Sequence, residues 1–182
     1  MYDVILADPP WSFEVWGEGG KGRSAEQHYS VMSLDDICAL SVASITNDNC
    51  ALFLWTLWTH IFDARTVIEA WGFTYRTLAW EWVKLNSGGM GLHMGRGYYT
   101  RSNVEPCLLA VRGSMPVAVR DELNVIMSPV RGHSRKPDEQ YHKIERLYPD
   151  TRRLELFARQ RWPGWDIWGN EVECDVVLEA GA

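Results

Sequence analysis

Four consecutive residues near the start of the chain, Asp8-Pro9-Pro10-Trp11, combine a carboxylate, two prolines and an indole. Each proline fixes its own φ angle and lacks an N–H, and each biases the preceding residue toward extended geometry. We therefore expect the backbone carbonyls of Asp8 and Pro9 to be held rigidly, without a local helical partner. A carboxylate, a carbonyl and a flat aromatic face together suit a planar molecule that carries an exocyclic amine.

This arrangement would suit methylation of such an amine. The lone pair of adenine's exocyclic amine is delocalised into the ring, so the nitrogen is a poor nucleophile. Acceptors that bind both hydrogens favour a tetrahedral nitrogen, whose lone pair can attack an activated methyl group. Catalysis would then come from orientation and electrostatics rather than from a reactive side chain. An ordinary turn after a strand, with Trp11 in the core, is the competing interpretation.

The elements that must position these residues follow an alternating pattern. The apolar run at 4–7 predicts a strand buried on both faces, and sheets of such strands bind ligands at their carboxyl ends. Further strands are predicted at 51–56, 77–85, 105–111 and 152–159, with a candidate edge strand at 172–178. Helices are predicted at 34–42, 60–70 and 137–148, with Ser33 as the N-cap of the first. The alternation predicts an α/β fold with a parallel sheet and right-handed crossovers.

Basic residues are densest just before the last predicted helix, where Arg131, Arg135 and Lys136 precede Pro137. Pro137 suits the first helical position, and acidic residues follow it in the first turn. Lys136 would then lie at a helix N-terminus, where backbone N–H groups and an ammonium together can hold a carboxylate or a phosphate. A lysine that simply faces solvent is the alternative.

Two glycine-rich segments, at 12–27 and 86–101, adjoin predicted strand ends. A connection as long as the second is unusual without a functional reason. It lacks the spacing and the strand-to-helix context of a phosphate-binding motif, so we interpret it as a substrate loop. Arg101 and Glu105 at its end are either a solvated pair or substrate contacts.

Length and composition favour one domain over residues 1–182. The net charge of −6 argues against a chain that coats nucleic acid through bulk charge, but it leaves room for a local basic groove. Four scattered cysteines without a CxxC pair favour a reducing, cytoplasmic location and neither a metal site nor a disulfide framework. The early first strand leaves no room for a signal peptide, and no apolar run could span a membrane.

A series of segments resembles, in order, the MT-A70-like methyltransferases, typified by the catalytic subunit of the messenger-RNA adenosine methyltransferase and including bacterial and phage relatives. The matching segments are DPPW at 8–11, HYSVMS at 28–33, LFLW at 52–55, WVK at 82–84, SRKPDE at 134–139, IERLYP at 144–149, ELFAR at 155–159 and WGNE at 168–171. The resemblance therefore covers nearly the whole chain.

The resemblance implies S-adenosylmethionine as cofactor and a Rossmann-like methyltransferase fold. Its central sheet would be mostly parallel and flanked by helices, and its motif order would be permuted. The implied catalytic residues are Asp8, Pro9, Pro10 and Trp11. The implied cofactor-binding residues are Asp8, Lys136, Phe157, Arg159, Asn170 and Glu171, with Lys136 on the cofactor's carboxylate and Arg159 on its ribose. The implied substrate-binding residues are Tyr29, Trp55, Glu105 and Arg135.

We thus expect a cytoplasmic methyltransferase, a monomer or homodimer, that methylates the exocyclic N6 amine of adenine and uses no metal. DNA is the favoured nucleic acid, and a target base in a duplex would be flipped out, with Trp11 replacing its lost stacking. The expected phosphate contacts are Arg131, Arg135, Arg152 and Arg153. The same chemistry on RNA is one alternative. The other is a catalytically silent nucleic-acid-binding subunit, against which the intact tetrapeptide counts.

Overall fold

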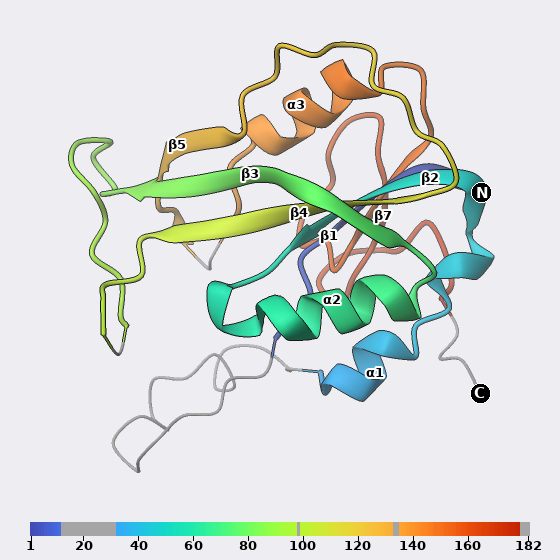
Figure 1. Cartoon of the computed structure of the whole chain (residues 1–182), viewed down its shortest axis with the longest axis horizontal. Helices are drawn as coiled ribbons and strands as arrows, with labels where there is room; N and C mark the ends of the chain where they lie inside the picture. The colour runs from blue at the N-terminus through green and yellow to red at the C-terminus, as the bar shows by residue number, and fades with distance from the viewer. Residues whose placement is uncertain (12–31, 98, 133–134, 179–182) are drawn as a thin grey trace.

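A twisted, mixed sheet forms the centre of the molecule (Figure 1). The structure, a computed structural model, describes residues 1–11, 32–97, 99–132 and 135–178, and the sheet has seven strands within these ranges. The strands are β1 (Tyr2–Ala7), β2 (Thr46–Trp55), β3 (Thr74–Leu85), β4 (Val104–Arg112), β5 (Val125–Pro129), β6 (Arg153–Leu156) and β7 (Asp166–Trp168). Their order across the sheet is β5-β3-β4-β2-β1-β6-β7.

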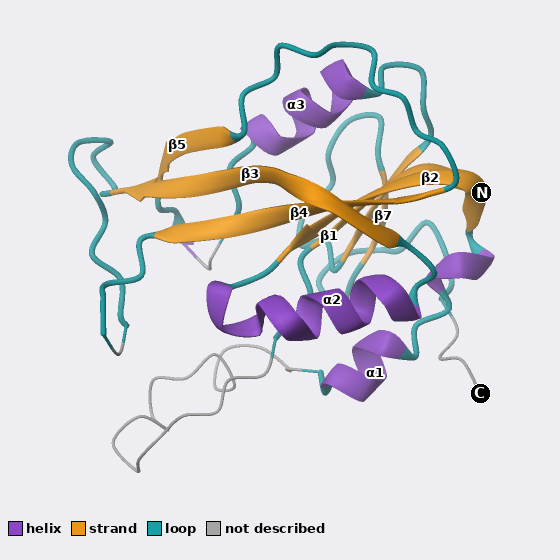
Figure 2. Cartoon of the chain, viewed as in Figure 1, coloured by secondary structure: helices purple, strands orange, loops and turns teal. Residues whose placement is uncertain are grey.

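Helices cover both faces of this sheet (Figure 2). Two of them, α1 (Leu34–Cys38) and α2 (Ile61–Ala70), lie on one face, and α3 (Glu139–Leu147) lies on the other. Short 3-10 turns, η3 (Val42–Ser44) and η4 (Trp58–His60), follow α1 and precede α2. The α/β class expected from the sequence is therefore confirmed.

Strand direction decides where a site can form. β1 pairs in parallel with β2 and β6, β6 with β7, and β3 with β5, whereas β4 is antiparallel to both β2 and β3. Six strands therefore point the same way and β4 alone is reversed. The reversal follows from the β3–β4 connection, since a parallel neighbour needs a crossover, usually helical, and residues 86–103 return the chain at the same edge. The carboxyl ends of six strands and the amino end of β4 share that edge.

Alternating side chains of β1 and β2 build a core on each face, as the apolar runs predict. Ile5 and Leu52 pack in the cluster that contains Val67 and Ile68 of α2. Residues one position away face α3, in a cluster that includes Val4, Leu6, Phe53, Tyr141 and Ile144. The central strands are thus buried on both faces.

Several element boundaries differ from those expected. The first helix ends at Cys38 because the N–H of Leu40 turns back to the carbonyl of Ile37, a tighter turn than α-helix. Its predicted cap is confirmed, since the Ser33 hydroxyl accepts from the N–H of Asp36 at 3.1 Å. Pro137 precedes the N-cap Asp138 instead of occupying the first helical position. β5 and β7 were not predicted.

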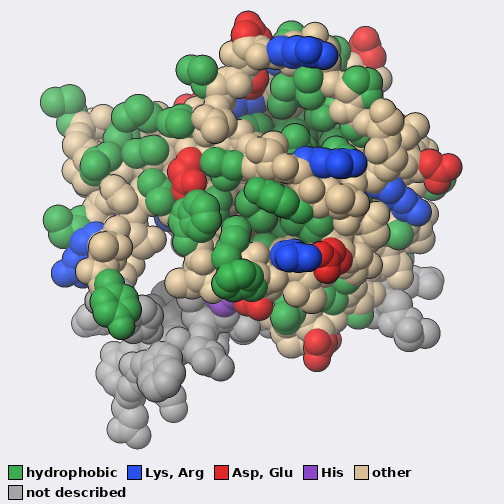
Figure 3. Space-filling model, viewed as in Figure 1, with side chains coloured by type: hydrophobic (Ala, Val, Ile, Leu, Met, Phe, Trp, Pro, Cys, Tyr) green, Lys and Arg blue, Asp and Glu red, His purple; other side chains and the backbone are tan. Residues whose placement is uncertain are grey.

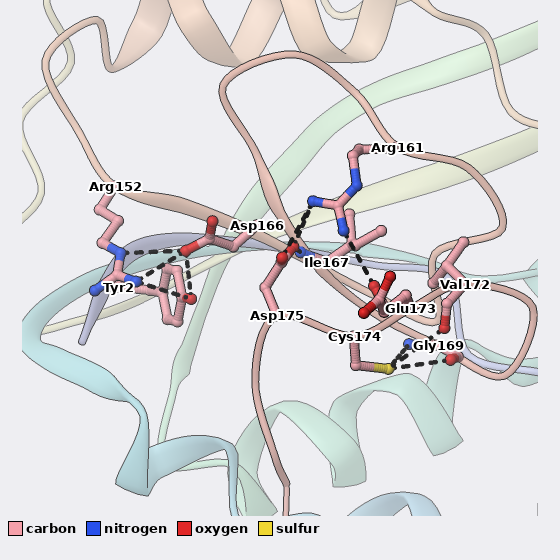
Figure 4. A network of polar contacts seen from close by, with 10 residues as sticks. All are labelled: Tyr2, Arg152, Arg161, Asp166, Ile167, Gly169, Val172, Glu173, Cys174 and Asp175. Carbon is pink, nitrogen blue, oxygen red and sulfur yellow. Dashed lines mark hydrogen bonds and ion pairs between the residues drawn. The ribbon is translucent and has the colours of Figure 1, made fainter.

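Residues 172–178 do not form the predicted edge strand. The Asp175 side chain instead takes the backbone hydrogen bond from Ile167 that a neighbouring strand would accept. The Asp175 carboxylate accepts from the N–H of Ile167, and the N–H of Asp175 donates to the Ile167 carbonyl, both at 2.9 Å. Arg161 grips the same carboxylate at 2.8 Å (Figure 4). The segment is therefore held beside β7 by Asp175, and Cys174 adds contacts to Gly169 just after β7.

Within the described ranges, none of the helices has the length and apolar character needed to traverse a lipid bilayer.

Gly113 ends β4 in a conformation that only glycine adopts without strain. Its φ is +62°, and an added Cβ would lie 2.3 Å from Oδ1 of Asn49 and 2.5 Å from the carbonyl of Asp48. We expect Gly113→Ala to lower the free energy of unfolding by about 1–3 kcal/mol, measured by urea denaturation. Gly88→Ala, which meets open space, is the matched control. Equal stability of the two variants would contradict this account of the turn.

Candidate active site

A cavity of about 360 Å³ opens at the edge where the parallel strands end. Its walls include Asp8, which follows β1, Trp55, the last residue of β2, and Phe157, which follows β6. Lys136, Tyr141 and Glu155 complete the part discussed below. This volume lies within the range of small-molecule sites, and the position is where α/β sheets bind ligands.

Asp8 and Lys136 meet at the centre of this cavity. The Lys136 ammonium donates to Oδ2 of Asp8 at 2.7 Å across 128 residues of sequence. The two prolines end β1 and aim the Asp8 side chain over the edge, and the loop after β5 carries Lys136 to it. Both residues were expected in the site, but their direct pairing was not.

Two further residues extend this pair into a chain of alternating charges. Oε2 of Glu105 lies 3.5 Å from the Lys136 ammonium, and Oε1 of Glu105 accepts from the Lys84 ammonium. We call Asp8, Lys136, Glu105 and Lys84 the ion chain. The side chains of Lys136 and Glu105 are only 11% and 10% exposed, so these charges interact in a weakly screened environment. Glu105 thus pairs with two lysines, whereas Arg101 is exposed.

The ion chain keeps its buried members charged. Burial alone would lower the pKa of Lys136, but Asp8 and Glu105 raise it above its ordinary value. Burial acts the opposite way on Glu105, yet the ammonium groups of Lys136 and Lys84 hold its pKa below the ordinary value. Each group is therefore ionised because its neighbours are.

Trp55 forms the floor beside Lys136. Its ring centroid lies 5.5 Å from the ammonium, within cation–π range, and its indole N–H donates to Oε1 of Gln140 on α3 at 2.6 Å. The ring is fixed from both sides, and the structure places it in the cavity wall.

Trp11 is buried under this floor. It is 7% exposed, its indole N–H donates to the Trp55 carbonyl at 3.2 Å, and its ring stacks on His60 at 5.9 Å. The cavity walls do not include it. The N–H of Trp11 donates to the Pro9 carbonyl at 2.9 Å, which is a tight turn and not a helical hydrogen bond. Trp11 thus fastens the turn after Asp8 to the end of β2.

A carboxyl group that sequence reasoning missed faces the cavity from β6. Glu155 pairs in register with Leu6 of β1, and its Oε2 accepts from the Tyr141 hydroxyl at 2.9 Å. Burial raises its pKa to about 7; the Tyr141 hydrogen bond lowers it, and the Asp8 charge raises it. Burial, followed by the charge of Glu155, also raises the pKa of Tyr141. A glutamate within an apolar strand is the only signal in the sequence.

Three of the four remaining expected cofactor residues, Phe157, Arg159 and Glu171, line the cavity. Phe157 has a φ of +62°, the one non-glycine residue with positive φ in the described part of the chain. Arg159 and Glu171 both line the cavity, with Nε of Arg159 3.8 Å from Oε1 of Glu171. Asn170 is exposed and lies outside the cavity walls.

The expected phosphate-binding arginines divide between the two edges of the sheet. Arg131 and Arg135 line the cavity, and both pair with Asp138, at 2.7 Å and 3.1 Å. Arg152 and Arg153 lie at the start of β6, at the opposite edge, where Arg152 pairs with Asp166 (Figure 4). Arg152 and Arg153 therefore do not lie beside the cavity, and their contact with phosphates stays a prediction. Tyr29 lies outside the described residues.

Among the described residues, no group of three or more His, Cys, Asp or Glu side chains could hold a metal ion.

A known protein family matches most of this chain. The family model described as MT-A70 matches residues 2–171. The chain belongs to the MT-A70 family. Every residue of the ion chain falls within the matched region.

Individual MT-A70 relatives differ in how much of them this chain represents. Type II methyltransferase M.MunI of Mycoplasma sp is 35% identical over 94% of this chain, which spans 78% of that relative. The probable N(6)-adenosine-methyltransferase MT-A70-like of Oryza sativa subsp. japonica is 34% identical, and the chain spans 24% of it. The N(6)-adenosine-methyltransferase catalytic subunit METTL3 of Homo sapiens is 33% identical, and the chain spans 28% of it. The chain therefore represents most of M.MunI and about a quarter of the two eukaryotic relatives.

The raised pKa of Glu155 predicts that the free energy of unfolding of this protein depends on pH. Because the folded state binds this proton more tightly than the unfolded state, Glu155 stabilises the fold below pH 4.5, and that contribution is lost as the pH rises through about 7. We expect wild type to lose about 3 kcal/mol relative to Glu155→Gln between pH 4 and 8, measured by urea denaturation. Glu69→Gln, at an exposed position of α2, is the control. A constant difference between wild type and Glu155→Gln would contradict the shift.

Proposed function

We propose that this protein transfers a methyl group from S-adenosylmethionine to the exocyclic N6 amine of adenine in DNA. The observation that carries the proposal is the state of the Asp8 carboxylate. Lys136 holds its Oδ2, and no described residue donates to its Oδ1. One acceptor oxygen at a rigid strand end is thus available to an amine that enters the cavity.

The residues present fit the cofactor. Lys136 has three ammonium hydrogens, and Asp8 and Glu105 engage two, so one remains for the carboxylate of an amino acid. Glu171 and Gln160 line the cavity and are acceptors for ribose hydroxyls, and Phe157 adds an apolar surface. When bound, S-adenosylmethionine supplies a methyl group carried on a sulfonium.

The mechanism requires only orientation and charge from this chain. Oδ1 of Asp8 accepts one hydrogen of the amine, and the Pro9 carbonyl, which has a second lone pair beside its bond to Trp11, accepts the other. Together they would favour a tetrahedral nitrogen whose lone pair attacks the sulfonium-borne methyl. As the N–C bond forms, the S–C bond would break, S-adenosylhomocysteine would leave, and the proton lost by the nitrogen would pass by way of the Asp8 carboxylate to water. Lys136 would hold Oδ2 of Asp8 in place, and Trp11 would keep the turn from shifting.

DNA is the proposed nucleic acid because of the coverage of the relatives. The chain spans 78% of M.MunI, a Type II methyltransferase, so the resemblance extends over most of that relative. The METTL3 relative favours the alternative, RNA adenosine, but the chain spans only 28% of it. The complete ion chain argues against the other alternative, a catalytically silent subunit. The proposal treats residues 1–182 as one methyltransferase domain that works in the cytoplasm.

Asp8→Asn tests the mechanism directly. The amide is isosteric with the carboxylate, but it presents a single acceptor oxygen without charge. We expect methyl transfer to adenine-containing DNA to fall by at least about 100-fold, with an unchanged far-UV spectrum. Transfer of labelled methyl groups from S-adenosylmethionine is the measurement. Asp150→Asn, an exposed residue away from the cavity, is the control.

Two outcomes of that assay would overturn the proposal. One is full activity of Asp8→Asn, and the other is methyl on cytosine. Competition between matched DNA and RNA oligonucleotides decides the polymer, and preferential labelling of the RNA would replace DNA with the alternative. A protein that binds neither S-adenosylmethionine nor oligonucleotides would support no methyltransferase reading.

A further inference from the structure

Residues 86–103 leave the sheet as a projecting arm between β3 and β4, seen at the left of Figure 1. We call this segment the arm. Its root is part of the candidate active site, because the ion-chain residues Lys84 and Glu105 lie on either side of it. The N–H of Lys84 donates to the Asn103 carbonyl at 2.9 Å, and its carbonyl accepts from the N–H of His93 at 2.8 Å. The arm is therefore anchored at the catalytic edge.

Glycines make the outer part of the arm narrow. An added Cβ at Gly95 would lie 1.9 Å from the carbonyl oxygen of Ser102, and one at Gly97 would lie 1.9 Å from that of Thr100. The two backbone segments can run this close together only without side chains between them. The shape is thus built into the sequence, which makes the arm more than a loose connection.

The side chains on this outer part are basic and aromatic, and they face solvent. Arg96, Tyr99 and Arg101 are exposed, Tyr99 fully so. Neither arginine has an ion pair or hydrogen bond to another described residue. No Asp or Glu occurs from 86 to 103, in a chain whose net charge is −6. Figure 3 shows Lys/Arg and hydrophobic side chains together over the arm at the left of the view.

Several arginines elsewhere on this protein are paired with carboxylates. Arg131, Arg146 and Arg161 each pair with an aspartate, at 2.7, 3.1 and 2.8 Å. Exposed Arg76 and Arg120, like the two arginines of the arm, have no ion pair or hydrogen bond to another described residue, so what sets the arm apart is an exposed phenol ring between two such guanidinium groups. Guanidinium groups suit phosphate oxygens, and exposed aromatic rings stack on unpaired bases. Such a combination is typical of surfaces that hold a nucleic-acid strand without reading its sequence.

We propose that the arm binds the nucleic-acid strand next to the adenine that enters the cavity. Arg96 and Arg101 contact backbone phosphates, and Tyr99 stacks on a base. The inference rests on the proposed function for the identity of the target base, but strand binding itself does not depend on methyl transfer. Exposed Met90 and Met94 on the same arm would suit a protein partner instead, and the experiment separates that outcome.

The test compares two double variants that remove the same charge. Arg96→Ala/Arg101→Ala removes two exposed arginines from the arm, and Arg76→Ala/Arg120→Ala removes two exposed arginines that line another cavity. Arg76 lies nine positions before Leu85 in β3, roughly 30 Å from the root of the arm. Affinity for a fluorescent oligonucleotide is measured over a range of salt concentrations. The arm variant should lower the slope of log affinity against log salt by about 1.4–1.8, and the control should keep the wild-type slope.

Tyr99 is tested by a conservative pair. Tyr99→Ala should weaken binding on the order of tenfold at constant salt slope, and Tyr99→Phe, which keeps the ring, should restore it. Calorimetry with S-adenosylmethionine should give wild-type affinity for every arm variant. Loss of oligonucleotide binding by the arm variant supports the arm even if no methyl transfer is found.

Equal oligonucleotide affinity and salt slope for wild type and Arg96→Ala/Arg101→Ala would overturn the inference. A change confined to the oligomeric state on size-exclusion chromatography would overturn it too, in favour of a protein contact.

Discussion

The buried ammonium of Lys136 is the group on which the site depends. Burial alone would lower its pKa and discharge it, and only the two flanking carboxylates, Asp8 and Glu105, reverse that tendency. Removing one carboxylate would leave a buried charge short of a partner, which costs several kcal/mol. The end of β1, the start of β4 and the loop before α3 must therefore be held in fixed relative positions.

The reversed strand β4 meets this requirement. In an all-parallel sheet the first residues of a strand lie at the edge opposite the site, and Glu105 would be out of reach of Lys136. Because β4 runs backwards between β2 and β3, Glu105 arrives at the carboxyl edge beside Lys84. The same reversal leaves the arm at that edge, so the charge pattern of the catalytic edge and the position of the arm have one topological cause.

Sequence reasoning found the local features of this protein and missed those that depend on distant pairing. The Asp8 turn and the helix after Lys136 carry their signals in adjacent residues, so both could be placed. The direction of β4 could not be predicted, because the apolar pattern of Val104–Arg112 does not distinguish a parallel strand from an antiparallel one. β5 exposes Val125 and Met127 and β7 has three residues, so neither forms an apolar run. The place of Glu155 in the site could not be predicted, because its hydrogen-bond partner Tyr141 comes close to it only in the folded chain.

Calorimetric titration of Lys136→Met with S-adenosylmethionine, beside Lys84→Met, tests the central role of the buried ammonium most directly. Both variants remove one positive charge from the ion chain, but only Lys136 also contacts Asp8 and lines the cavity. The account predicts that Lys136→Met lowers the affinity by at least about tenfold, while Lys84→Met stays within about threefold of wild type. Wild-type affinity in a folded Lys136→Met protein would contradict it.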